Sequence, residues 1–71
     1  MTIDNFLQID PFTHGAVMGW GVVRFEPWCL AGVFETEHKA KDLATKLGTD
    51  YEVFYGSYKL GTASFIWGIE L

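Results

Sequence analysis

The segment 36–48, TEHKAKDLATKLG, is the one part of the chain whose hydrophobic periodicity predicts an α-helix. Its apolar residues recur at i, i+3, i+4 and i+7, which places them on one stripe of the helix surface: Ala40, Leu43, Ala44 and Leu47. Thr36 is a residue type that caps helix N-termini, and Gly48 is the type that ends helices in the left-handed conformation. An amphipathic helix this short needs an apolar surface to lie on, so the rest of the chain must supply one.

Four stretches around this helix have the composition of β-strands, at 16–25, 28–35, 50–58 and 62–69. A Glu26-Pro27 turn joins the first two, and a loop containing Gly61 joins the last two, so each pair predicts an antiparallel hairpin. The order of elements predicts an α+β fold of two layers, ββαββ. In it, a four-stranded antiparallel sheet carries one helix packed on one face.

The alternation of side chains within the strands makes two further predictions. Gly19 and Gly21 interrupt the first strand, and we expect them to leave room for a large neighbour such as an aromatic ring. In the second strand, Leu30 and Phe34 are expected to share one face of the sheet, because they are four residues apart. Residues 1–15 fit neither a helix nor a strand pattern cleanly. They predict an N-terminal arm or short edge strand, followed by a single α+β domain at 16–71.

The strands direct apolar side chains to both faces of the predicted sheet, although one short helix can cover only one face. Two outcomes are open at this point. Either the N-terminal arm and curling of the sheet cover the second face, or an exposed apolar patch forms an interface with another chain. The twelve aromatic residues, 17% of the chain, favour an interface, because protein interfaces are enriched in them.

Charge and cysteine content limit the partners and the cellular compartment that the sequence favours. The formal net charge of −4 argues against nonspecific binding to nucleic acid or to an anionic membrane, which requires a basic patch. Cys29 is alone, so no internal disulfide is possible. The first residues lack the basic region of a signal peptide, and no stretch reaches the ~20 apolar residues of a membrane helix. We therefore expect a cytoplasmic protein without a membrane partner.

Catalytic and metal-binding patterns are weak. His14 and His38 do not fall at ligand spacings with each other or with Cys29. Cys29 lies between a tryptophan and a leucine in an apolar strand, which is typical of a structural thiol rather than a nucleophile. No two acids are spaced so as to suggest a shared pocket for acid–base chemistry. The sequence predicts no enzyme activity, no cofactor and no metal site.

These observations favour a small non-catalytic intracellular module that binds a protein and acts by occlusion or scaffolding. The candidate anchors at the protein interface are Trp20, Trp28, Tyr55, Tyr58 and Trp67. The stretch AKDLATKLGTDYEVFYGS resembles segments of small phage and prophage proteins. Together with the size and acidity of the chain, this analogy suggests a phage- or prophage-encoded inhibitor of a host protein.

Two alternatives belong to other classes of function. A binder of single-stranded nucleic acid or nucleotides would stack bases on strand tyrosines and neutralise phosphates with nearby cations. Its residues would be Tyr51, Tyr55, Tyr58, Arg24 and Lys59. The acidic balance of the chain makes this partner the less favoured one. The second alternative is a plain structural homodimer, in which the partner is another copy of the chain.

Overall fold

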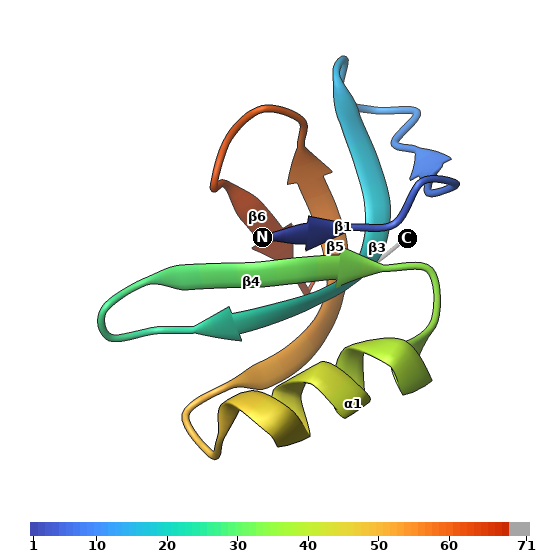
Figure 1. The fold of residues 1–71 in the computed structure, drawn as a ribbon. Coiled ribbons are helices and arrows are strands. Elements are labelled where there is room, and N and C mark those ends of the chain that lie inside the picture. Colours follow the sequence, from blue (N-terminus) through green and yellow to red (C-terminus); the bar gives the residue numbers. More distant parts are fainter. Residues whose placement is uncertain (69–71) are drawn as a thin grey trace.

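The computed structural model describes residues 1–68, which form one helix and one mixed sheet of short strands (Figure 1). The elements in chain order are β1 (Thr2–Ile3), β2 (Gln8–Ile9), β3 (Ala16–Arg24), β4 (Cys29–Phe34), α1 (Glu37–Leu47), β5 (Glu52–Lys59) and β6 (Phe65–Trp67). The order in the sheet is β1-β4-β3-β5-β6, with β2 also paired to β3. The predicted α+β class is confirmed.

The predicted four-stranded antiparallel sheet is wrong in two respects. β1 adds a parallel strand beside β4, and β2 adds an antiparallel strand beside the first half of β3. Both strands have only two residues, too few for a period of two to be visible in the sequence. The strand predicted at 62–69 is also shorter than expected. It covers Phe65–Trp67 and ends where Gly68 takes a φ of 73°, and residue 69 lies outside the described residues.

The helix α1 forms where the periodicity placed it. The hydroxyl of Thr36 accepts a hydrogen bond from the Lys39 backbone N–H at 3.3 Å, which caps the first turn. At the other end Gly48 has a φ of 122°, and its N–H donates to the Ala44 carbonyl at 3.0 Å. Ala40 is fully buried, because the apolar stripe packs against β3, β4 and β5.

The sheet curls so that its apolar residues form two separate clusters. One cluster lies under α1 and centres on Val22, Phe34 and Ala40. The other lies on the opposite face, where β1 and β6 close over β3 and β4 (Figure 1). Leu7 and Ile3 from the N-terminal segment pack against this second cluster. The chain therefore covers part of its second face itself.

The two glycines of β3 permit this curling. A Cβ at Gly21 would lie 2.7 Å from Cε2 and 2.8 Å from Cε1 of Phe65, so the ring of Phe65 occupies the space that a side chain would need. A Cβ at Gly19 would meet Val33 and Leu7 in the same way. The expectation that these glycines leave room for an aromatic neighbour is confirmed at Gly21.

The prediction that Leu30 and Phe34 of β4 share one face of the sheet is wrong, because β4 contains a β-bulge. Val23 pairs with Leu30 and Val22 pairs with Gly32, so Ala31 has no partner on β3. The extra residue shifts the alternation by one place. Leu30 therefore joins the cluster opposite α1, whereas Phe34 joins the cluster under α1.

Asp10 ties the N-terminal segment to the sheet. Its side chain is almost completely buried, and its two carboxylate oxygens accept hydrogen bonds from the Ser57 hydroxyl at 2.7 Å and the Phe12 backbone N–H at 2.9 Å. The Ser57 hydroxyl and then the Phe12 N–H stabilise the charged form, and they lower the pKa of Asp10 below 3.8 although burial acts in the opposite direction.

Replacing Asp10 with asparagine is expected to destabilise the protein at neutral pH and to have little effect in acid. A lowered folded-state pKa contributes stability that is present above the unfolded-state pKa of about 3.9 and is lost as the pH falls through the folded-state value. Urea unfolding of wild type and Asp10→Asn should therefore give a difference in unfolding free energy at pH 7 that shrinks toward pH 2. The exposed Asp42→Asn variant is the control and should change the unfolding free energy at pH 7 by less than about 1 kcal/mol. A constant difference for Asp10→Asn would contradict the assignment.

Candidate functional site

Four aromatic side chains gather on the face of the sheet opposite α1, and we call Phe25, Trp28, Phe54 and Trp67 the aromatic cluster. The indole of Trp67 lies at its centre. Its ring centroid is 5.8 Å from Trp28, 5.5 Å from Phe54 and 5.5 Å from Phe25. The two tryptophans are nearly parallel, at 12°. Such stacked and tilted pairs each contribute about 0.5–1.5 kcal/mol beyond their burial.

Local structure explains how these rings meet. Phe25 and Trp28 flank the turn between β3 and β4, so the turn brings both rings to one end of the sheet. The indole N–H of Trp28 donates to the Ala63 carbonyl at 2.9 Å, which fixes its ring against the loop before β6. Trp67 also stacks on the buried Phe65, with ring centroids 6.2 Å apart. The cluster is therefore anchored to the core.

The outer rings of the cluster remain open to solvent. Phe25 is 41% exposed and Trp28 is 40% exposed, although each contacts other aromatic rings. Phe54 and Trp67 are half-buried beneath them. The aromatic cluster is therefore contiguous, held in place by its neighbours and partly open to solvent.

The structure divides the five predicted anchors among three places. Trp28 and Trp67 belong to the aromatic cluster. Trp20 and Tyr55 lie on the α1 side of the sheet and contact each other edge to face, with centroids 5.1 Å apart. Tyr58 is only 4% exposed, and its hydroxyl donates to the Thr62 carbonyl at 2.8 Å, so its ring offers no surface to a partner.

Sequence reasoning missed Phe25 and Phe54 as members of the site. The available signal was the alternation of side chains along the strands, which puts Phe25 on the same face as Val23 and Phe54 on the opposite face from Val53. Phe25 and Phe54 meet Trp28 and Trp67 only because of the β3–β4 turn and the pairing of β6 with β5. Neither feature is visible in the spacing of residues alone.

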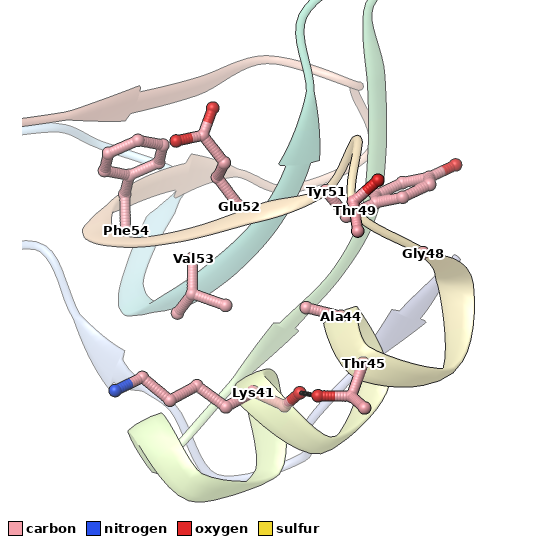
Figure 2. A pocket seen from close by; sticks show the side chains of 9 residues that line it. All are labelled: Lys41, Ala44, Thr45, Gly48, Thr49, Tyr51, Glu52, Val53 and Phe54. Carbon is pink, nitrogen blue, oxygen red and sulfur yellow. Dashed lines mark hydrogen bonds between the residues drawn. The ribbon is translucent and has the colours of Figure 1, made fainter.

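A groove of about 600 Å³ runs beside this cluster, between the second half of α1 and the start of β5 (Figure 2). Its lining residues are Lys41, Ala44, Thr45, Gly48, Thr49, Tyr51, Glu52, Val53 and Phe54. In Figure 2, Val53 points toward the helix, whereas Glu52 and Phe54 point away from it. Phe54 lines the groove and also belongs to the aromatic cluster, which lies on the face of the sheet opposite α1.

Tyr51 closes one end of the groove and is held from two sides. The guanidinium of Arg24 lies 5.5 Å from its ring centroid, a cation–π contact. Its hydroxyl donates to the Cys29 sulfur at 3.8 Å. That hydrogen bond, followed by burial, raises the pKa of Tyr51, and the charge of Arg24 opposes this shift. These contacts hold the ring of Tyr51 between Arg24 and Cys29.

The tyrosines considered for stacking nucleic-acid bases do not form one platform. Tyr51 is covered by Arg24, Tyr55 packs on Trp20, and Tyr58 is buried on the other face of the sheet. Across residues 1–68, no group of three or more His, Cys, Asp or Glu residues is placed to hold a metal ion. His38 instead lies 3.4 Å from Asp42 on the exposed side of α1.

The chain matches no protein-family model, and no curated protein or solved structure is similar enough to it to count as a match. In the part of the chain that the structure describes, no helix combines the length and the apolar character needed to cross a membrane.

Proposed function

We propose that this protein is a small non-catalytic module that binds another protein through the aromatic cluster and acts by covering or scaffolding its partner's surface. The observation that carries the proposal is the stacked pair of Trp28 and Trp67, which is fixed from below by Phe65 yet open to solvent at Trp28. Tryptophan is the residue type most enriched among the hot spots of protein interfaces.

The physical argument is one of preorganisation. Association is opposed by the ordering of side chains, at about 0.5–1.5 kcal/mol for each flexible one. Trp28 is already held by its hydrogen bond to Ala63 and by two aromatic neighbours, so little ordering remains to be done on binding. The rings can therefore contribute most of their burial energy to affinity.

Charge indicates the kind of partner. The chain carries −4 overall, and the exposed Glu26 lies in the turn between Phe25 and Trp28. A neutral or basic surface with an apolar patch complements this site, whereas an acidic one is repelled. A cytoplasmic setting is part of the proposal, supported by the lone Cys29. A phage-encoded inhibitor of a host protein is the use that the size and acidity suggest by analogy.

The test begins with capture of partners on the immobilised full chain from an extract of the source organism, followed by mass spectrometry. Each captured protein is then purified and titrated calorimetrically. We expect Trp28→Ala to weaken binding at least about 30-fold, which corresponds to about 2 kcal/mol at a hot spot. The matched control is Phe12→Ala, which removes an 84% exposed ring outside the cluster and should change the affinity less than about twofold.

Circular dichroism must show that both variants fold. A Trp28→Ala variant that binds as tightly as the wild type would refute the proposal. Sedimentation of the free protein identifies the case in which the partner is a second copy: self-association would then appear in the wild type and be lost in Trp28→Ala.

A further inference from the structure

The charged side chains of the protein are divided between the two faces of the sheet. Three of the basic residues lie on α1, and the alternation along β3 and β5 turns the other two to the α1 face, in the rows of Val22 and Val53. The five are Arg24, Lys39, Lys41, Lys46 and Lys59. Residues 69–71 contain no Lys or Arg, so this division of the basic residues holds for the whole chain.

Two acidic residues lie at the border of the aromatic cluster, on the opposite face. Glu52 precedes Phe54 by two residues on β5, and both side chains point away from the helix (Figure 2). Glu52 pairs with Val23, which places its side chain beside Phe25, two residues further along the same face. Glu26 follows Phe25 directly in the β3–β4 turn. Both carboxylates therefore flank the ring of Phe25, and both residues are exposed.

The nearest basic side chains do not neutralise these two carboxylates. Lys41 lines the groove together with Glu52, but its ammonium lies 3.5 Å from the carboxylate of Glu37 on the exposed side of α1. The guanidinium of Arg24 lies over the ring of Tyr51, on the α1 side of the sheet. The N-terminal α-amino group lies at β1, and β4 and β3 separate β1 from β5 in the sheet. The border of the aromatic cluster is therefore acidic.

The rings between the two carboxylates suit a planar cation. Trp67 covers one face of the Trp28 indole, and the 40% exposure of Trp28 leaves its outer side open. Cations bind over aromatic faces, and tryptophan is the strongest partner of this kind. A guanidinium stacks on aromatic planes, is less strongly hydrated than an ammonium and pairs with a carboxylate through two parallel hydrogen bonds. Aromatic faces next to unpaired carboxylates therefore favour arginine over lysine.

We propose that the aromatic cluster binds an arginine side chain of the partner protein. The guanidinium stacks on the exposed rings of Phe25 and Trp28. The carboxylates of Glu26 and Glu52 pair with it from either side. This inference rests on the proposed function and names the chemistry that the same site recognises.

The first test uses random heptapeptides displayed on phage and selected on the immobilised full chain. We expect the selected peptides to share an arginine among apolar residues. In synthetic copies, replacing that arginine with lysine should weaken binding at least about threefold, and replacing it with uncharged citrulline at least about tenfold. Selected peptides without arginine, copies that bind equally well with lysine or citrulline, or a selection that yields no binder would each overturn the inference.

The second test removes the two carboxylates at constant shape. The double variant Glu26→Gln/Glu52→Gln should bind the arginine peptides at least about tenfold more weakly than the wild type. The matched control, Glu37→Gln/Asp42→Asn, removes the same charge from the exposed side of α1 and should change the affinity less than about twofold. Circular dichroism must show that both variants fold. Equal losses in the two variants would assign the effect to net charge and overturn the inference.

The two proposals can fail separately. If Trp28→Ala weakens binding of the natural partner while Glu26→Gln/Glu52→Gln does not, the aromatic cluster is the docking site and the arginine is refuted. If neither variant weakens that binding, both proposals are refuted.

Discussion

Replacing Phe65 with alanine is expected to lower the free energy of unfolding by about 3–5 kcal/mol, the range typical of a buried phenylalanine. A chain of this size has about 4–11 kcal/mol in total. Phe65 is 5% exposed, and its ring fills the space above Gly21 and supports Trp67. Removing it leaves a cavity that the surrounding strands cannot close, because Gly21 has no side chain to move into it.

The measurement is urea unfolding followed by tryptophan fluorescence and circular dichroism. Ile66→Ala is the matched control: it is the next residue on the same strand, but its side chain is 61% exposed and points away from the core. It should lose less than about 1 kcal/mol. If Phe65→Ala were no more destabilising than Ile66→Ala, the closure of β6 over Gly21 would be refuted.

The parts of the fold that were predictable are those governed by local chemistry. The stripe of α1, its cap at Thr36 and its end at Gly48 depend on neighbouring residues only, and all three are present. The glycine of the predicted β5–β6 turn, Gly61, has a positive φ of 79°, a conformation that glycine adopts without steric cost. The close approach of the Phe65 ring to Gly21 was also predictable in kind, because a glycine inside a strand often marks a close neighbour.

The parts that were not predictable depend on pairing between distant residues. The bulge at Ala31 leaves no mark in composition, yet it puts Leu30 and Phe34 on opposite faces of the sheet. Asp4 follows β1 and Asp10 follows β2, and they accept hydrogen bonds from groups far along the chain, the N–H of Glu35 and the hydroxyl of Ser57 respectively. A strand of two residues is too short to show a hydrophobic period, so such a contact cannot be predicted from the sequence pattern.

In the candidate site, too, some features follow from local sequence and others from the pairing of distant residues. The surplus of aromatic residues favours an exposed interface over self-coverage, with Trp28 and Trp67 among its candidate anchors. Their convergence with Phe25 and Phe54 required the β3–β4 turn and the β5–β6 register. Tyr58 shows the limit of composition, because an identical residue type three positions after Tyr55 is buried by β6.

Replacing Gly56 with alanine is expected to separate β6 from β5 and to destabilise the protein by about 3 kcal/mol or more. A Cβ at Gly56 would fall on the Ile66 carbonyl oxygen and lie 2.8 Å from the Trp67 Cα. These are backbone atoms of the paired strand, so no rotation of a side chain can relieve the overlap. The Cβ of an alanine at Gly21, by contrast, would press on the outer end of the Phe65 ring.

The same substitution links stability to function, because β6 carries Trp67. When β6 moves away, Trp67 can no longer stack on Trp28, so hydrogen exchange at the β5–β6 ladder should accelerate and binding through the aromatic cluster should weaken together. Gly15→Ala is the control, since Gly15 has a φ of 79° and no atom within 4 Å of a built Cβ. It should cost only the about 1–2 kcal/mol of a left-handed alanine and leave binding intact. Equal losses in the two variants would mean that backbone conformation, rather than the close approach of β6, governs this edge of the sheet.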